Sequence, residues 1–562
     1  MRKRIPVKNH YLEIQLTASR SLLAMLMITL LVCLLIARLS WLQLYKKDVY
    51  STLSTNNWLD LVPAEPTRGL IYDRNGILLA ENIPVFSLEV IPYEVRNLNE
   101  TLDKLGTIIA FNENELAQFH KQLKQHRRFD EIPLKLRLTE EEVMHFAENQ
   151  HRFPGVNISA RLMRHYPFGE SFGHVLGYVG RINTQELNDI DAANYSASHY
   201  IGKLGIEKHY EQQMHGEVGY QQVENDASGQ PIRVLKEIKG KPGKNLYLTL
   251  DSSLQFIAEN ALKGHRGAVV AIDPTNGEVL ALVSQPGYDP NLFVTGISQQ
   301  DYQALQDSPD HPLYNRALRG QYPPGSTLKP FLAIQGLEAG VIEADTEIYD
   351  KGWYTTKNST RRYHDSNYGG HGMVNLNKAI VTSCDIYFYK LAETLGINSM
   401  NDMLSQFGYG RLSEIDLDHE LPGVLPTPEW KRATKGASWY PGDSINVSIG
   451  QGFIQTTPLQ LAAATATLAN RGIHVTPHLL LGEQLPGEVY HHYQANPQPP
   501  IQLSDNQYWE SVISAMKNVV TSPRGTGRRY GKKHNYSIAM KTGTAQVVAK
   551  RNQDGKDDQA SW

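Results

Sequence analysis

The chain contains 562 residues, of which 20% are charged, and its formal net charge at pH 7 is −3. This near-neutral balance gives no sign of a nucleic-acid partner, and the composition is that of a large globular protein. Its two cysteines exclude a disulfide scaffold, because Cys33 lies inside an apolar run and cannot pair with Cys384.

The first predicted element is a helix that spans a membrane. The run from Ser21 to Ala37 contains no charged residue and is rich in Leu, Met, Ile and Val, and apolar residues continue it past Arg38. A cleaved signal peptide is the alternative interpretation, but Arg38-Leu39-Ser40-Trp41 offers no small-residue cleavage site. We therefore expect residues 21–43 to form an uncleaved membrane anchor.

The residues before this helix indicate its orientation. They are mainly basic, with Arg2, Lys3, Arg4, Lys8 and Arg20 against Glu13. Because positive charges stay on the cytoplasmic side, residues 1–20 are predicted to form a cytoplasmic tail and the rest of the chain to lie outside. Basic residues just after the helix, Arg38, Lys46 and Lys47, weaken this asymmetry but do not reverse it.

A second module is predicted between residues 44 and 240. The segment from Pro66 to Ala80 has the pattern of a hairpin that turns at Asn75-Gly76. The segments Leu116–His126 and Thr139–Asn149 have helical patterns with mixed charge. Since no nucleophile is paired with a base in this module, we interpret it as a structural spacer of mixed α and β structure.

The third module, residues 241–562, opens with another predicted hairpin. Ala268–Ile272 leads through the turn Asp273–Gly277 into Glu278–Val283. This hairpin would begin an antiparallel sheet with helices on its faces, which makes the predicted fold class α+β.

A candidate nucleophile follows this hairpin at Ser326. It stands in Pro323-Pro324-Gly325-Ser326-Thr327-Leu328-Lys329, where the prolines and the glycine precede a run with helical spacing, so Ser326 is expected at or near a helix start. Lys329 then shares a face with Ser326 and is a candidate base. A lysine acts as a base when burial or a neighbouring cation lowers its pKa, and Lys541 is a candidate for that cation.

Two later motifs supply further candidate groups. The hydroxyl of Ser383, in Ser383-Cys384-Asp385, is expected to relay a proton between Lys329 and a leaving amine. The segment Lys541-Thr542-Gly543-Thr544 is predicted to be a strand. Its glycine would admit a ligand backbone, its threonines would bind a carboxylate, and the Thr544 N–H would complete an oxyanion hole with that of Ser326.

A metal site is a further hypothesis, because a lone thiol outside the cytoplasm is a liability unless it is buried or liganded. The proposed ligands are Asp350, Asp365, His371 and Cys384. Two oxygens, one nitrogen and one sulfur suit a closed, structural Zn²⁺ site. The alternative is that Cys384 is a small buried core residue.

The order of these motifs, with Gly450-Gln451-Gly452 between the second and the last, resembles the serine penicillin-recognising transpeptidases and β-lactamases. The N-terminal module is similar to the pedestal of class B penicillin-binding proteins in three segments, Arg164–Pro167, Gly173–Gly180 and Gly205–Gly216. The segments Trp439–Asp443 and Ser448–Gly452 resemble the elongation-specific subgroup of that class.

The resemblance implies a peptidoglycan D,D-transpeptidase that cross-links stem peptides during lateral wall elongation. It implies that Ser326 attacks a D-Ala-D-Ala carbonyl, that Lys329, Ser383 and Asp385 serve the catalysis, and that β-lactams acylate Ser326. The substrate-binding residues would be Lys541, Thr542, Gly543 and Thr544, and the chemistry needs no cofactor. It further implies a single-pass protein of the bacterial inner membrane with a periplasmic catalytic domain, and a RodA-like glycosyltransferase and the scaffold MreC as partners.

Two features depart from the family pattern. Asp385 stands where much of the superfamily has an asparagine, and an ionised carboxylate accepts hydrogen bonds but cannot donate one to a substrate carbonyl. Relatives also continue with more strands and a helix after the Lys-Thr-Gly segment. We therefore expect this chain to be a fragment of a longer protein, truncated after that strand, whose folding or activity suffers from the exposed sheet edge.

Two other functions stay open from the sequence. The first keeps the enzyme class but uses water as the acceptor, as in a D,D-carboxypeptidase or a β-lactamase. The second is a non-enzymatic penicillin-binding scaffold that activates a partner glycosyltransferase.

Overall fold

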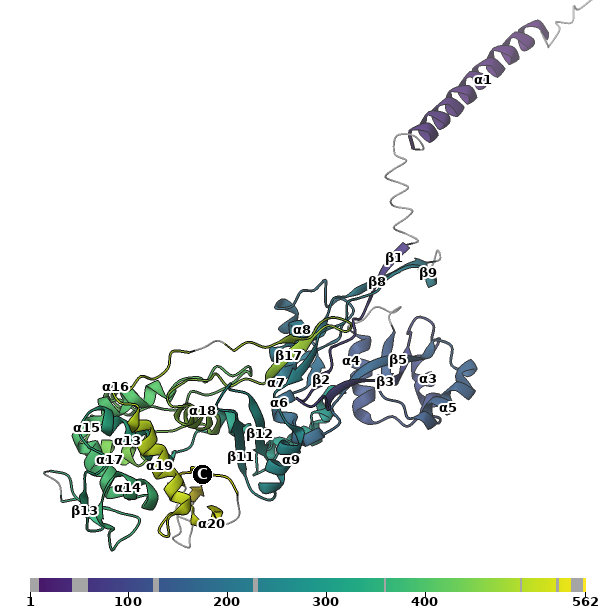
Figure 1. The fold of residues 1–562 in the computed structure, drawn as a ribbon. Coiled ribbons are helices and arrows are strands. Elements are labelled where there is room, and N and C mark those ends of the chain that lie inside the picture. The colour runs from purple at the N-terminus through teal and green to yellow at the C-terminus, as the bar shows by residue number, and fades with distance from the viewer. Residues whose placement is uncertain are drawn as a thin grey trace, which may run out of the picture. The chain divides into compact units, whose positions relative to one another are not determined.

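The computed structural model describes residues 10–42, 59–124, 131–225, 231–357, 360–495, 498–531, 535–546 and 559–561. The chain divides into two compact units. The first comprises Met1–Pro66, Ala192–Ala197 and Glu217–Lys241, and the second comprises Thr67–Asp191, Ser198–Gly216 and Pro242–Trp562. Figure 1 shows both units with their elements labelled.

The first unit contains the long apolar helix α1 (His10–Ser40) and a small antiparallel sheet. The sheet has the order β1 (Leu59–Ala64), β8 (Gly219–Asn225) and β9 (Pro231–Ile238). Within α1, Arg20–Ser40 has a mean hydropathy of 2.7 and is the one helix of the described chain that is long and apolar enough to cross a membrane. The predicted anchor is confirmed as an apolar helix, and the end of its range at residue 43 lies outside the described residues.

The second unit is organised by one large mixed sheet. Its strand order is β18 (His491–His492), β17 (Leu480–Gln484), β10 (Asn245–Leu248), β2 (Ile71–Tyr72), β3 (Leu78–Val90) and β4 (Ile132–Lys135), with β5 (Val156–His165) also paired to β3. The hairpin predicted around Asn75-Gly76 is confirmed as the antiparallel pair of β2 and β3. Because β10 pairs with β2 in parallel and with β17 antiparallel, this sheet joins strands from the predicted spacer and from the predicted third module.

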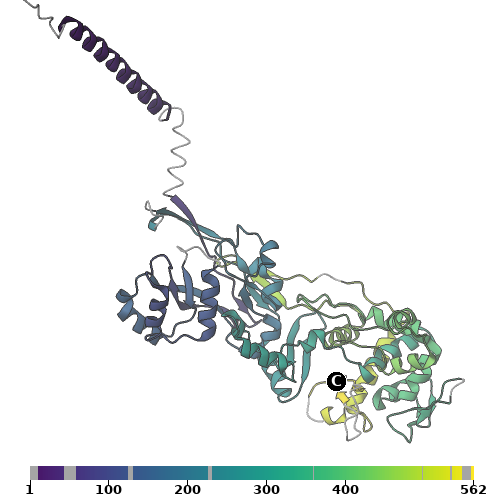
Figure 2. The same cartoon turned by 180° about the vertical axis from the view of Figure 1, so that it is seen from behind.

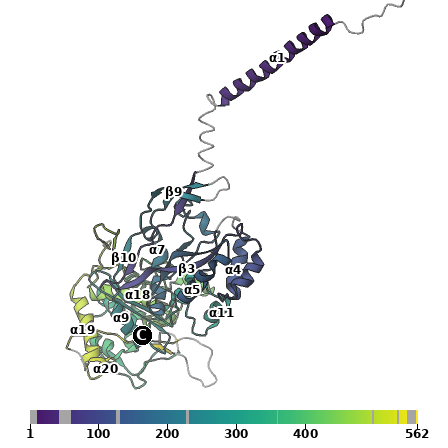
Figure 3. The ribbon, with the colours of Figure 1, turned by 90° about the vertical axis from the view of Figure 1, so that its right-hand side faces the viewer.

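Three helices cover the β3–β4–β5 end of this sheet, as Figure 3 shows for α4 and α5 beside β3. They are α3 (Leu98–Leu105), α4 (Glu113–Leu123) and α5 (Glu140–Asn149). The α5 helix is where its pattern predicted it, with Thr139 as the N-cap. The other prediction, Leu116–His126, was placed too late, because a capping box between Asn112 and Glu115 starts α4 at residue 113.

The hairpin predicted in the third module is confirmed as β11 (Gly267–Ile272) and β12 (Val279–Gln285). Helix α9 (Ser252–Ala261) contacts β12, and α12 (Arg316–Arg319) and α18 (Pro458–Ala469) contact β11. Figure 2 shows this part of the molecule from behind. Helices on an antiparallel pair confirm the predicted α+β class.

A helical half completes the module around one buried apolar core. Its main elements are η5 (Gly325–Leu328), α13 (Lys329–Glu338), α14 (Leu376–Thr382), α15 (Asp385–Gln406), α17 (Pro441–Ser448) and α19 (Gln507–Thr521). Buried side chains such as Phe331, Tyr387 and Trp509 join these helices. The helical half carries the first two sequence motifs at the ends of its helices, where backbone groups are free to face a ligand.

The remaining elements are short. Those before residue 250 are η2 (Gln150–Arg152), η3 (Gly169–Ser171), α6 (Gly173–Leu176), β6 (Val179–Arg181), η4 (Glu186–Asn188), β7 (Tyr200–Gly202), α7 (Gly205–His209) and α8 (Glu211–His215). Those after it are α10 (Asn291–Val294), α11 (Gln299–Asp307), β13 (Ile348–Asp350), β14 (Trp353–Tyr354), β15 (Tyr363–His364), β16 (Gly372–Val374), α16 (Pro428–Lys435), α20 (Arg528–Gly531), β19 (Thr544–Gln546) and β20 (Gln559–Ser561).

Candidate active site

Ser326 lies on a tight turn that is joined to two distant segments. The N–H of Gly325 donates to the carbonyl of Gly450 at 2.9 Å, and a Cβ on Gly325 would come within 2.6 Å of the Thr544 carbonyl oxygen. Both Gly325 (φ 59°) and Gly450 (φ 70°) have left-handed backbone conformations. Glycine is therefore needed for its backbone conformation as well as for its lack of a side chain. The first motif, the Gly450-Gln451-Gly452 segment and the last motif are thereby held together.

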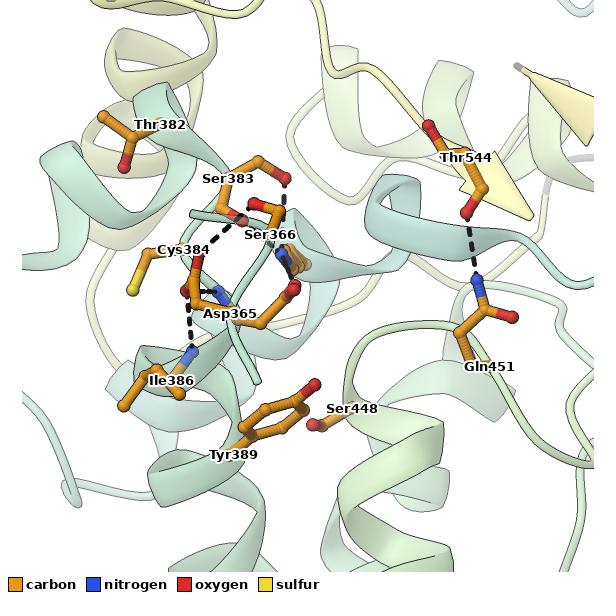
Figure 4. A network of polar contacts seen from close by, with 12 residues as sticks. Asp365, Ser366, Thr382, Ser383, Cys384, Ile386, Tyr389, Ser448, Gln451 and Thr544 are labelled. Carbon is orange, nitrogen blue, oxygen red and sulfur yellow. Dashed lines mark hydrogen bonds and ion pairs between the residues drawn. The ribbon is translucent and has the colours of Figure 1, made fainter. Parts of the chain in front are cut away.

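Gln451 strengthens this junction, although sequence reasoning gave it no role. Its Nε2 donates to the Thr544 carbonyl at 2.9 Å, as Figure 4 shows. The Gly-x-Gly pattern around Gln451 was the available signal, because glycines on both sides of a polar residue are typical of close backbone approach.

Ser326 lies at a helix start, as predicted, but the first turn is a 3₁₀ turn. Ser326 belongs to the 3₁₀ turn η5, and α13 begins at Lys329 with Pro330 in its first turn, where a missing N–H costs nothing. Ser326 is half-buried, and its hydroxyl has no hydrogen-bond partner among the described residues. Such a hydroxyl is open to a substrate.

Lys329 lies at the centre of the site and is fully buried, with 0% of its surface exposed. Its Nζ donates to Asp385 Oδ1 at 2.6 Å, to the Ser383 carbonyl at 2.7 Å and to the Ser383 hydroxyl at 3.2 Å. Three oxygen acceptors therefore surround this buried nitrogen and satisfy its N–H groups. The expected contact of Lys329 with the second motif is confirmed, and Asp385 is its counter-ion.

Ser383 links the two lysines of the site. It ends α14 in a left-handed conformation (φ 58°), which is strained for a serine and is typical of functional sites. Its hydroxyl accepts from Lys541 Nζ at 2.8 Å while it contacts Lys329 on the other side. A continuous chain of polar groups therefore runs from Lys329 through Ser383 to Lys541.

Burial lowers the pKa of Lys541 well below its usual value, and the neighbouring cation of Lys329 lowers it further, although Asp385 opposes the shift. The sequence suggested that Lys541 would depress the pKa of Lys329. In the structure Asp385 pairs directly with Lys329, at 2.6 Å.

This shift predicts a pH dependence of stability. The folded-state pKa of Lys541 lies below the unfolded value near 10.5, so between these values the unfolded chain binds more protons than the native protein. The contribution of Lys541 to the free energy of unfolding is therefore most unfavourable at low pH and becomes less so as the pH rises through this window. We expect Lys541→Met, which removes the buried amine, to lose this rise.

Melting temperatures of the full chain between about pH 7 and about pH 10 test the prediction. The melting temperature of Lys541→Met minus that of the unchanged protein should decrease steadily over this range. The exposed Lys517 on α19 provides the matched control, since Lys517→Met should show a constant difference. A constant difference for Lys541→Met as well would contradict the assigned shift.

The last motif differs from its prediction in secondary structure. Lys541, Thr542 and Gly543 lie outside any strand, and β19 begins only at Thr544, where it pairs with Ser561 of β20. A strand forms only beside a partner strand, and none pairs with residues 541–543 among the described residues. The Thr542 hydroxyl instead donates to that of Thr526 at 2.9 Å. The predicted strand is therefore wrong for residues 541–543.

The four candidate metal ligands come together in space. Ligand atoms of Asp350, Asp365, His371 and Cys384 all lie within 4.8 Å of one another. Asp350 Oδ2 lies 2.8 Å from His371 Nδ1 and 3.4 Å from Cys384 Sγ, and His371 Nδ1 lies 3.5 Å from Asp365 Oδ1. The side chains of both carboxylates are 0% exposed.

This donor set fits a divalent cation. Burial, with Asp365 and Asp350 nearby, raises the pKa of the Cys384 thiol, so without a cation the thiol stays protonated beside two buried carboxylates. The cluster also contacts the catalytic motif directly, because Asp365 Oδ2 accepts from the N–H groups of Asp385 at 2.7 Å and Ile386 at 3.3 Å (Figure 4). Asp365 thus holds the start of α15.

Two family models match this chain. Residues 63–248 match the family model of the penicillin-binding protein dimerisation domain, and residues 267–562 match that of the penicillin-binding protein transpeptidase domain. The peptidoglycan D,D-transpeptidase MrdA of Escherichia coli K12 is 44% identical over 549 residues, which cover 96% of this chain and 86% of the relative.

Two solved structures share the fold. One is penicillin-binding protein 2 in complex with MreC from Helicobacter pylori, with a TM-score of 0.75 and 30% identity over 87% of this chain and 90% of that one. The other, described as a peptidoglycan synthase complex that coordinates polymerization and crosslinking, has a TM-score of 0.68 and 27% identity over 94% of this chain and 89% of that one.

Proposed function

The chain belongs to the penicillin-binding protein family as a peptidoglycan D,D-transpeptidase of the MrdA type, and on this premise we propose the roles of its residues. It is a serine-type enzyme that binds β-lactams. Ser326 is the nucleophile, Lys329 the general base and Ser383 the proton relay. The observation that carries these roles is the chain of polar contacts from Lys329 through Ser383 to Lys541, at the turn that presents Ser326.

The first half of the reaction forms an acyl-enzyme. The Ser326 oxygen attacks the D-Ala-D-Ala carbonyl, and Lys329 accepts the hydroxyl proton while Asp385 stabilises the ammonium form that results. Ser383, between the two lysines, passes a proton to the departing D-Ala amine. N–H groups of Ser326 and Thr544, held together by the glycine junction, bind the oxyanion.

The second half transfers the acyl group to an amine of a neighbouring stem peptide, and that amine loses its proton along the same chain. Lys541, Thr542, Gly543 and Thr544 are the substrate-binding residues. The lysine and the threonine hydroxyls bind the terminal carboxylate of the stem peptide or of a β-lactam, and the glycine leaves room for the substrate backbone.

Product analysis tests transpeptidation against the carboxypeptidase alternative. Incubation of the full chain with nascent peptidoglycan from a lipid-linked precursor should give cross-linked dimers whose formation exceeds release of D-Ala to water. A product consisting only of shortened, uncross-linked stem peptides would instead assign water as the acceptor. Penicillin should block both products, because both pass through Ser326.

The metal cluster is proposed to hold one structural Zn²⁺. The supporting observation is the buried set of two carboxylates, one imidazole and one thiol. All four protein positions are filled, so the ion would take no part in the chemistry. Asp365 would bind it through one oxygen while the other oxygen keeps its hydrogen bonds to the start of α15, which fixes Lys329's partner Asp385 in place.

Elemental analysis of the purified full chain is expected to find about one zinc per chain, and its removal by a chelator to lower the melting temperature by roughly 5 °C and slow acylation by penicillin. Cys384→Ala should lose the zinc, whereas Cys33→Ala, at the cysteine of α1, should retain it. Chelation that changes neither the melting temperature nor the acylation rate would reject the site.

The domain limits, location and partners are also proposals. We assign residues 1–20 to a cytoplasmic tail, 21–43 to the anchor, 44–240 to the pedestal and 241–562 to the transpeptidase domain, which would lie in the periplasm. The positive charges before α1 support this orientation. Protease added outside spheroplasts should digest the transpeptidase domain; protection of that domain would reverse the orientation.

A RodA-like glycosyltransferase and MreC are the proposed partners in lateral wall elongation. Support comes from the related penicillin-binding protein 2 that forms a complex with MreC and from the related peptidoglycan synthase complex. Both partners should co-purify with the membrane-extracted full chain at near-equal amounts. Recovery of the chain without either of them, from cells that express all three, would argue against the assembly.

A further inference from the structure

A small hairpin beside the active site carries cations that are stacked on aromatic rings. It consists of β14 and β15, and we call it the basic hairpin, defined by Lys351, Trp353, Arg361, Arg362 and Tyr363. Lys351 Nζ lies 3.5 Å from the centroid of the Trp353 ring, and Arg362 Cζ lies 4.4 Å from it. Arg361 Cζ lies 5.1 Å from the centroid of the Tyr363 ring. The three cations are exposed.

Two cations of the basic hairpin, Lys351 and Arg362, have no carboxylate partner among the described residues. Because both cations contact one indole ring, their charges lie within about 8 Å of each other and repel. The aromatic rings hold these exposed cations in place, which is an arrangement suited to an external anion.

The basic hairpin is attached to the catalytic motif. Only Tyr363 and His364 separate Arg362 from Asp365, which accepts the N–H of Asp385 at 2.7 Å. The Tyr363 ring lies 5.9 Å from that of Tyr389 on α15. Arg362 is thus within about 10 Å of the residue that positions Asp385, given the reach of three extended residues.

The same tyrosine, Tyr363, also lies against α17. A Cβ on Gly442 would come within 2.3 Å of the Tyr363 hydroxyl, so this tyrosine packs on the first turn of that helix. The α17 helix leads directly into the Gly450-Gln451-Gly452 segment that joins Ser326 to Thr544. A ligand bound at the hairpin would therefore lie at the edge of the catalytic site.

We propose that the basic hairpin binds side-chain carboxylates of the peptidoglycan stem peptide while its D-Ala-D-Ala end lies at Ser326. This inference rests on the proposed function and names a specificity determinant for it. The terminal carboxylate is already bound by the Lys541 segment, so the hairpin serves carboxylates farther along the peptide. Arginine is well suited to this role, because its planar fork binds a carboxylate through two parallel hydrogen bonds.

The test compares two synthetic peptides that end in D-Ala-D-Ala and differ only in whether their side-chain carboxylates are free or amidated. D-Ala release by the full chain is measured for each. The double variant Lys351→Ala, Arg362→Ala should lower kcat/KM for the acidic peptide about tenfold, mainly through KM, and leave the amidated peptide within about twofold. Arg362→Lys, which keeps the charge but not the fork, should show a smaller loss.

Two controls make the result specific. Lys517→Ala, which removes an exposed cation on α19, should not distinguish the peptides. Acylation by penicillin, which has no such side chain, should be unchanged in every hairpin variant. Equal losses for both peptides, or no loss for either, overturn the proposal. Failure of the unchanged chain to release D-Ala or to form a penicillin adduct would instead contradict the proposed function.

Discussion

Ser326→Ala is expected to abolish the covalent adduct between the full chain and a fluorescent penicillin, and to lower cross-linking by about 10⁴-fold or more. The variant removes the atom that forms the acyl bond, and the site offers no substitute, because the hydroxyl of Ser383 is already bound by Lys329 and Lys541. Intact mass measured after incubation with the antibiotic checks the prediction directly.

The neighbouring hydroxyl gives the control for this experiment. Thr327 lies on the same turn, and its hydroxyl donates to the Pro324 carbonyl at 2.7 Å, so Thr327→Ala should acylate within about threefold of the unchanged chain. A penicillin adduct that persists in Ser326→Ala would assign the nucleophile elsewhere. A chain that forms no adduct at all, yet supports wall elongation with Ser326→Ala, would be a scaffold and not a transpeptidase.

Lys329→Met should slow acylation by about 10³-fold to 10⁴-fold while the protein stays folded. Methionine keeps most of the side-chain volume but removes the base that accepts the Ser326 proton. The change also leaves Asp385 without its counter-ion, although Asp385 is partly exposed, with 15% of its side chain accessible, and can recruit water. We therefore expect a large kinetic effect and a smaller loss of stability.

Stopped-flow acylation rates, with melting temperatures alongside, separate these effects. Lys135→Met is the matched control, because Lys135 also forms a close ion pair, with Glu142 at 2.6 Å, but far from Ser326 in sequence. It should lose stability and keep its acylation rate. A Lys329→Met protein that acylates at the normal rate would show that another group, such as Lys541, is the base.

Several elements could be predicted from short stretches of sequence. The apolar helix, both hairpins and the α5 helix depend on residues that are close together in the chain, such as Thr139 and Glu142 in a capping box. Boundaries were less accurate. The start of α4 at residue 113 and the 3₁₀ turn at Ser326 were missed, because a cap and a tight turn override the apolar spacing from which helices are predicted.

Only part of the candidate site could be predicted from short stretches of sequence. The residue types and their order identified Ser326, Lys329, Ser383 and Lys541, because each motif is short and chemically distinctive. Residues 541–543 were wrongly expected to form a strand. A strand forms only where a neighbouring strand hydrogen-bonds to it, and the local sequence does not specify that neighbour. Gln451 received no role, because its only described contact with the site is made to Thr544, 93 residues away.

The sequence by itself determined the anchor, the order of the modules and the chemical groups of the site, because these follow from local patterns and from residue type. Only the tertiary structure decided which groups touch. It paired Lys329 with Asp385 and assigned the lowered pKa to Lys541, and it used Asp365 to hold the start of α15. These outcomes depend on burial and on distances between residues far apart in the chain, and both exist only once the chain has folded.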